Sequence, residues 1–239
     1  MTPRRKLEEM SVNKPTQVTQ SIGFTARETI VIVAIDGPAG AGKSSVARAL
    51  AERLGFRYLD TGAMYRALTW LALRRGIALD DVPALVELAI HNPVEFDSGD
   101  GVAIAGHDVT TLIREPVIDS SVPVVARHAE VRSVMRDRQR ILGEQGDSVI
   151  EGRDIGVVVV PHADLKIWLV ADPGVRAERR HAERDGISAD TLADEMRRRD
   201  ERDAANTHRA ADAVEVDTTL LSLSEVIDRI EGLVQERVA

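Results

Sequence analysis

TIVIVAIDGPAGAGKSSVARALA, at residues 29–51, is the stretch of sequence that decides the fold. It opens with an apolar, β-branched run over residues 30–35, whose composition is typical of a strand buried on both faces. Residues 37–44 match every position of the pattern G-x-x-x-x-G-K-[ST], and apolar residues then recur at helical spacing from Val46 to Leu54. A strand, a glycine-rich loop and a helix in this order predict a phosphate-binding loop.

The chemistry of a nucleoside triphosphate explains each residue type in this loop. Glycines let the backbone approach an oligophosphate closely, so that several N–H groups and the positive end of the helix converge on it. Lys43 is expected to place its charge against the β- and γ-phosphates, while the Ser44 hydroxyl can reach a Mg²⁺ ion. A glycine-rich turn that binds nothing is the less favoured interpretation, because the whole pattern matches. The candidate ATP-binding residues are Gly37, Pro38, Ala39, Gly40, Ala41, Gly42, Lys43, Ser44 and Ser45.

Composition limits the kind of protein in which this loop works. The chain has 239 residues, 44% of them hydrophobic, which suits one globular domain or a domain with an insert. A net charge of −8 and an aromatic content of 3% argue against a large nucleic-acid surface. No apolar run approaches the ~18 residues of a membrane span, and the lack of cysteine excludes disulfides and thiolate zinc sites. We expect a cytoplasmic monomer without a nucleic-acid or membrane partner.

The rest of the chain alternates strand and helix patterns. Apolar runs at residues 56–60, 148–151, 166–170 and 213–217 predict four more core strands. Helical patterns cover residues 61–72, 76–92, 112–145, 173–184, 191–202 and 223–238, with a break near residues 116–123 and N-caps at Thr61 and Asp172. Short runs at 94–96, 102–104 and 107–109 predict a β-rich insert. The predicted fold is α/β: a P-loop NTPase fold with a five-stranded parallel sheet flanked by helices.

Four ordered motifs carry a resemblance to a known family. They are IDGPAGAGK at residues 35–43, LDTGAMYR at 59–66, GRDIG at 152–156 and DAVEVDTT at 212–219. This series resembles the bacterial cytidylate kinases, members of the nucleoside monophosphate kinase family, from about residue 30 to the C-terminus. Residues 1–28 are polar and show no sustained period, so we expect a mobile tail there, and the resemblance implies a kinase domain at 29–239. Within that domain it implies a core at 29–60, 147–175 and 210–239, a nucleotide-acceptor region with the β-insert at 61–146, and an arginine-rich lid at 176–209.

The resemblance also implies an activity and its partners. The expected reaction is Mg²⁺- and ATP-dependent phosphorylation of CMP or dCMP to the diphosphate, with small nucleotides as the partners. The phosphate of CMP is already largely dianionic at neutral pH, because the second pKa of a phosphate monoester is about 6. Catalysis therefore needs positioning and charge neutralisation rather than a general base.

The same motif matches imply roles for single residues. Lys43, Arg153 and Arg199 are the expected catalytic residues. Asp154 and Arg132 are expected to read the cytosine edge, because a carboxylate accepts from the exocyclic amine and a guanidinium donates to ring nitrogen or oxygen. Ser44 is the expected Mg²⁺ ligand, with Glu151, which ends a buried strand, acting through a water molecule. The full set of acceptor-binding candidates is Thr61, Tyr65, Arg66, Arg132, Arg153, Asp154, Arg199 and Asp203.

Two departures from the family pattern leave other interpretations open. Pro123 stands where relatives often carry a serine, and the segment after Asp203 is shorter and lacks an arginine in register, for which Arg209 is the candidate replacement. The alternatives are a P-loop kinase for another small acceptor, such as a different nucleoside monophosphate, dephospho-coenzyme A or shikimate, and a nucleotide-binding module with impaired catalysis. A regulatory switch is a further class, but no N-K-x-D signature supports it.

Overall fold

The computed structural model describes residues 30–97, 101–182, 189–204 and 207–238. The expected N-terminal tail lies outside these residues, as do the side chains of several residues of the seventh helix, Arg199 and Asp203 among them. None of the described helices is both long and apolar enough to cross a bilayer.

Five parallel strands form the central sheet, as predicted. They are β1 (Ile32–Asp36), β2 (Arg57–Asp60), β6 (Ser148–Glu151), β7 (Leu165–Val170) and β8 (Val214–Asp217), in the order β2-β6-β1-β7-β8. β1 lies in the middle, between β6 and β7, and all five of its residues are buried. The strand that leads into the phosphate loop is therefore the central, fully buried strand of the sheet.

Helices cover both faces of this sheet, which explains the continuous apolar run in β1. Val33 and Ile35, with Val31 directly before the strand, join a core with helices α1 (Lys43–Leu54) and α8 (Leu223–Val238). Ile32 and Ala34 face the other way and pack with the short π-helical segment Ile155–Val159. Alternate residues of β1 thus enter two different cores, as expected for a strand buried on both faces.

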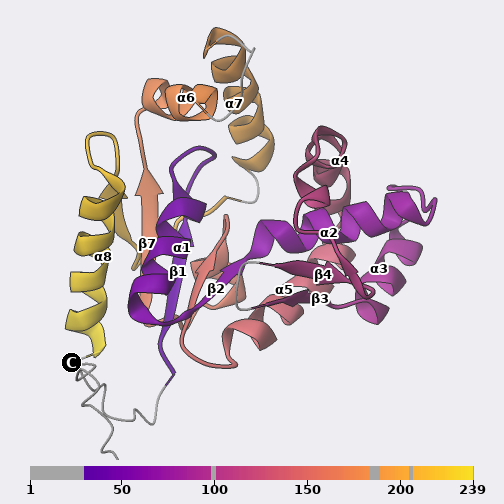
Figure 1. The fold of residues 1–239 in the computed structure, drawn as a ribbon, viewed down its shortest axis with the longest axis horizontal. Helices are drawn as coiled ribbons and strands as arrows, with labels where there is room; N and C mark the ends of the chain where they lie inside the picture. Colours follow the sequence, from indigo (N-terminus) through magenta and orange to yellow (C-terminus); the bar gives the residue numbers. More distant parts are fainter. Residues whose placement is uncertain (1–29, 98–100, 183–188, 205–206, 239) are drawn as a thin grey trace, which may run out of the picture.

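A second group of elements has a core of its own beside the sheet (Figure 1). It contains α2 (Thr61–Arg74), α3 (Val82–His91), α4 (Pro116–Ala126) and α5 (Ala129–Gly143), with a 3₁₀ helix at Leu112–Arg114. Its antiparallel sheet consists of β3 (Val94–Phe96), β4 (Val102–Ile104) and β5 (His107–Asp108). This sheet confirms the predicted β-rich insert. We call the group the insert unit.

Two further helices stand above the phosphate loop (Figure 1). They are α6 (Pro173–Ala182) and α7 (Ala189–Asp203), here called the α6–α7 pair. Asp172 caps α6 as predicted, since its carboxylate accepts the Gly174 N–H at 2.7 Å. The pair carries the arginine-rich sequence that was expected to form the lid.

The structure corrects three local predictions. Asp60, not Thr61, caps α2, because its carboxylate accepts the Ala63 N–H at 2.8 Å while Thr61 is the first helical residue. The long helical region breaks at residues 127–128 rather than near 116–123, since Pro116 suits a first helical position and Pro123 is accommodated inside α4. The helix expected over residues 76–92 begins only at Val82, where the Asp81 side chain caps it.

Candidate active site

The candidate site lies along the carboxyl edge of the parallel sheet. The register pairs both Ile35 of β1 and Asp60 of β2 with Glu151 of β6, so these strands end at one level. Asp36, Asp60 and Glu151 are buried, although each carries a carboxylate. Open α/β sheets bind ligands at this edge, and buried carboxylates need specific partners there because desolvation disfavours their charge.

The phosphate loop follows β1 and leads into α1. Gly42 caps this helix at a φ of 90°, a left-handed conformation that favours glycine. A Cβ atom on Gly37 would lie 2.3 Å from the Leu169 carbonyl oxygen, so the loop can approach β7 this closely only with glycine there. The Lys43 ammonium donates to the Pro38 carbonyl at 2.8 Å and so lies across the loop. The predicted residues thus form a compact loop with its lysine folded over it.

Glu151 is held by two hydroxyl groups beside the loop. The Tyr58 hydroxyl donates to its carboxylate at 2.7 Å, and Ser44 makes a side-chain hydrogen bond with it. Burial, aided by the negative charge of Asp60, raises the pKa of Glu151. The structure therefore brings together Ser44 and Glu151, the pair predicted to serve Mg²⁺.

The donor set here fits Mg²⁺. No cluster of three or more His, Cys, Asp or Glu side chains that could hold a metal ion occurs in the described part of the chain. Mg²⁺ needs no such cage in kinases, because substrate phosphates and water complete its octahedral shell of oxygens. One hydroxyl and one carboxylate in direct contact are the type of protein ligands that such a site uses.

Asp36 connects the phosphate loop to the GRD segment. Its two carboxylate oxygens accept the N–H groups of Ile155 and Gly156, each at 2.8 Å. Burial raises the pKa of Asp36 to about 6, against the lowering effect of these hydrogen bonds. Arg153 adds a second connection, because its guanidinium donates to the Gly37 carbonyl at 3.3 Å. Hydrogen bonds therefore join the donor loop directly to the segment that carries the predicted acceptor residues.

Three of the predicted acceptor-binding residues gather on the insert-unit side of this segment. Arg132 of α5 donates to the Asp154 carboxylate at 2.8 Å, with side-chain exposures of 18% and 13%. Burial raises the pKa of Asp154, while Arg132 opposes that rise. Tyr65 lies near both: burial raises its pKa to about 12, and the charges of Arg132 and Asp154 act on it in opposite directions. The cluster offers an acceptor, a donor and a ring close together.

Two other predicted residues lie close to this cluster in the chain but bind different partners. Arg66 donates to the Asp119 carboxylate of α4 from both Nε and Nη2, each at 3.2 Å. The same carboxylate lies 4.0 Å from Arg180 of α6, so it links the insert unit to the α6–α7 pair. The Thr61 hydroxyl donates to the Glu151 backbone carbonyl at 2.7 Å and joins α2 to β6. Thr61 thus contacts backbone in this structure.

The remaining predictions concern the segment around α7. The side chains of Arg199 and Asp203 lie outside the described residues. Arg209, the candidate for the missing lid arginine, donates instead to the Glu215 side chain and to the Ala213 carbonyl, at the side of β8. Pro123 lies half-buried inside α4.

Sequence reasoning missed Tyr58, Asp36 and Asp119. The sequence held a usable signal for Tyr58. It stands two positions before Asp60 on β2, so both side chains lie on the same face of the strand. The pairing of this strand with β6, which ends in Glu151, could also have been inferred. Asp36 lies inside the quoted motif, but its partners 119 and 120 residues away cannot be read from it. No local pattern marks Asp119 as a partner of two arginines.

Comparisons with known proteins agree with this geometry. Residues 33–236 match the sequence profile of the family described as cytidylate kinase. Two curated relatives, both named cytidylate kinase, are 48% identical over 217 residues (Geobacillus sp. strain WCH70) and 47% identical over 222 residues (Anoxybacillus flavithermus). These matches cover 86% and 88% of this chain, and 97% and 99% of the relatives.

A comparison of folds gives a more distant likeness. An uncharacterised protein from Eubacterium ventriosum has a solved structure with a TM-score of 0.51 and 15% sequence identity, covering 87% of this chain and 99% of that one. At that identity the likeness concerns the fold alone. The sequence matches span nearly the whole described chain, and from them it follows that this protein belongs to the cytidylate kinase family.

Proposed function

We propose that the protein transfers the terminal phosphoryl group of ATP to CMP or dCMP and releases ADP with CDP or dCDP. The observation that carries this proposal is the Arg132–Asp154 pair, held at 2.8 Å beside Tyr65 and directly after the strand that ends next to the phosphate loop. Family membership and the complete phosphate-loop motif support the same activity.

The cytosine edge matches the two members of this pair. Its exocyclic amine donates hydrogen bonds, whereas its ring nitrogen and carbonyl accept them. Asp154 would accept from the amine, and Arg132 would donate to the ring. A uracil edge offers a carbonyl in place of the amine, so it would leave the Asp154 carboxylate facing an acceptor. A site built around buried polar groups rejects such a mismatch strongly.

Phosphoryl transfer would take place between this residue pair and the phosphate loop. Loop N–H groups and Lys43 would hold the donor phosphates, and Arg66 would bind the acceptor phosphate in place of its present partner, Asp119. Arg153, already in contact with the loop at Gly37, would neutralise charge on the moving group. Arg199 is proposed for the same task and Asp203 for the ribose, both on the basis of the motif match. The acceptor phosphate attacks as a dianion, so no residue has to remove a proton.

Mg²⁺ is proposed as the cofactor. Bound with ATP, it would neutralise phosphate charge during transfer. On the protein side, the Ser44 hydroxyl would be a ligand, and Glu151 would orient a coordinated water molecule. We also propose a monomer that works in the cytoplasm, where its nucleotide substrates occur; sedimentation of the purified protein tests the first of these statements.

The proposal is tested by removing Asp154 and comparing acceptors. Asp154→Ala should lower kcat/KM for CMP by about 100-fold, since truncating one partner of a buried ion pair is costly, while ATP binding in the absence of acceptor changes less than about twofold. Asp137→Ala on α5 is the matched control, because Asp137 is exposed and pairs only weakly with Arg140, at 3.6 Å. Unchanged use of CMP by the Asp154 variant, or an equal loss with every acceptor, would rule out its assigned role.

A kinase for another small acceptor is the alternative class. It would bind ATP but release ADP only with its own acceptor and not with CMP. A module with impaired catalysis would bind ATP but would not release ADP, whichever acceptor is added. Nothing in the described contacts favours either over the cytidylate kinase activity.

A further inference from the structure

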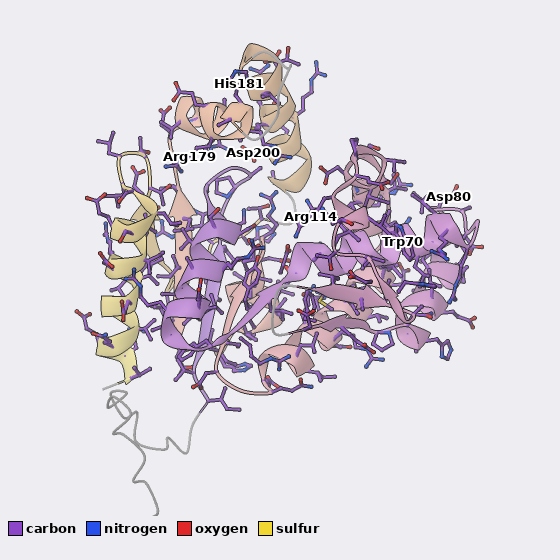
Figure 2. All side chains as sticks on the ribbon, in the orientation of Figure 1. Trp70, Asp80, Arg114, Arg179, His181 and Asp200 are labelled. Carbon is purple, nitrogen blue, oxygen red and sulfur yellow. The ribbon has the colours of Figure 1, made fainter. Side chains whose placement is uncertain are left out.

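The phosphate loop is held from above by the α6–α7 pair. The Asp200 carboxylate of α7 accepts the Ala39 N–H at 3.2 Å, although the two residues are 161 positions apart. Arg176 of α6 donates from one nitrogen both to the Ala39 carbonyl, at 2.9 Å, and to Asp200, at 2.6 Å. Asp200 lies at the lower side of the helix pair, which faces the loop (Figure 2). We call Arg176 and Asp200 the loop clamp.

Three successive carbonyls of the loop each accept from a different cation. Gly37 accepts from Arg153 at 3.3 Å, Pro38 from Lys43 at 2.8 Å and Ala39 from Arg176 at 2.9 Å. The Ala39 N–H instead donates to an anion, the Asp200 carboxylate. The orientation of these peptide groups is therefore set by charged side chains from four separate parts of the chain.

One peptide group connects Asp200 to Lys43. The Pro38 carbonyl and the Ala39 N–H belong to the same planar trans peptide, so they point in opposite directions. Asp200 holds the N–H end, and Lys43 donates to the carbonyl end. Rotation of this peptide would break both contacts together. Fixing the N–H therefore also fixes the acceptor to which the Lys43 ammonium is bound.

The clamp is tightly packed and partly buried. Side-chain exposure is 12% for Arg176 and 26% for Asp200, so little water competes for their ion pair. Arg176 Nε is buried and has no hydrogen-bond partner within the described part of the chain. The methyl group of Met196 lies 2.5 Å from the place where a Cβ on Gly40 would be, so α7 rests directly on the loop. Such packing holds the two side chains in one arrangement.

We propose that Asp200 is a positioning residue of the donor site: it orients the Pro38–Ala39 peptide and, through it, Lys43. Arg176 holds Asp200 in place and binds the next carbonyl. This role rests on one part of the proposed function, the binding of the donor phosphates by Lys43. The clamp thus makes the α6–α7 pair part of the donor site, beyond the expected role of its arginines toward the transferred group.

The test is a double-mutant cycle read as ATP affinity. Calorimetric titration of ATP, without acceptor, is carried out on the wild type, Asp200→Ala, Lys43→Ala and the double variant. Asp200→Ala should weaken ATP binding by about fivefold or more. In the Lys43→Ala background the same change should weaken it less than about twofold, because Asp200 then has no lysine to position. Equal effects in both backgrounds would overturn the proposal.

Two further variants separate positioning from packing. Asp200→Asn keeps an oxygen that can accept the Ala39 N–H but loses the ion pair, so it should retain most of the ATP affinity that Asp200→Ala loses. If both variants lose affinity equally, the charge pair and not the peptide contact matters, and the proposal fails. Asp194→Ala is the matched control on α7, since Asp194 is exposed and its hydrogen bond to Arg197, at 2.8 Å, stays on one helix. It should leave ATP affinity unchanged.

These outcomes are independent of the acceptor. If CMP is not phosphorylated by the wild type, the proposed function fails, while the ATP titrations still decide the role of Asp200. Conversely, additive effects in the cycle would show that Asp200 does not act through Lys43, and would leave the proposed acceptor specificity untouched.

Discussion

Asp36 gives the stability of this protein a pH dependence that can be isolated by one substitution. Burial raises the pKa of Asp36 from 3.8 to about 6. A folded-state pKa above the unfolded value means that the native state binds the proton more tightly between these two values. The stability contribution of the protonated group is therefore complete below about pH 4 and is lost as the pH rises through about 6. The shift corresponds to about 3 kcal/mol, at about 1.4 kcal/mol for each tenfold change in the equilibrium.

Asp36→Asn removes this titration but keeps the size of the side chain. Urea unfolding of both proteins, followed by circular dichroism, gives a free-energy difference at each pH from 4 to 7.5. The wild type should lose about 2.4 kcal/mol relative to the variant over this range, with most of the change below pH 6.5. Carboxylates that do not interact with Asp36 titrate alike in both proteins, so their effects cancel in the difference.

The control for this experiment is Asp137→Asn, which removes an exposed carboxylate on α5. A flat difference curve for Asp36→Asn would refute the reasoning. So would a wild type that gains stability as the pH rises, because the two backbone hydrogen bonds from Ile155 and Gly156 would then outweigh desolvation.

Three further predictions concern the donor site. Lys43→Ala should leave a folded protein, by circular dichroism, whose turnover with CMP falls at least about 100-fold; wild-type turnover would contradict the assignment of the loop. Tyr58→Phe removes the hydroxyl from Glu151 while keeping the ring, so the Mg²⁺ concentration for half-maximal rate should rise about threefold or more, with the KM for CMP unchanged; an altered CMP KM and a constant Mg²⁺ requirement would argue against this. Gly37→Ala would place a Cβ 2.3 Å from the Leu169 carbonyl oxygen and should lower the free energy of unfolding by about 2 kcal/mol or more, measured by urea denaturation; a loss below about 0.5 kcal/mol would show that the loop can shift away from β7.

The sequence predicts the central architecture well because strong local signals carry it. The β-branched run before the loop, the complete phosphate-loop motif and the short apolar runs leave few ways to arrange a five-stranded parallel sheet. The final helix, Leu223–Val238, has the predicted limits, since its amphipathic pattern starts and stops sharply. Errors arise where two neighbouring residues can play the same part, as Asp60 and Thr61 can at the start of α2.

The candidate site also has residues that the sequence predicts and residues that it does not. Motif residues such as Lys43, Arg132 and Asp154 can be named from the sequence, and the structure brings the last two into contact. The partners of the site residues cannot be named from the sequence. A contact such as that of Ala39 with Asp200 joins residues 161 positions apart and depends on how the helices pack against the loop. A π-helical turn at Ile155–Val159, which supplies the N–H groups for Asp36, also has no local sequence signal.

The most direct test of the account is a measurement of ADP release from Mg-ATP by the purified protein with CMP, dCMP, UMP, AMP and GMP in turn. We expect high rates with CMP and dCMP, a much lower rate with UMP and almost none with the two purine nucleotides, because Arg132 and Asp154 match the cytosine edge. No ADP release with any of the five acceptors, from a protein that still binds ATP, would contradict the proposed activity. So would a ranking led by a purine nucleotide.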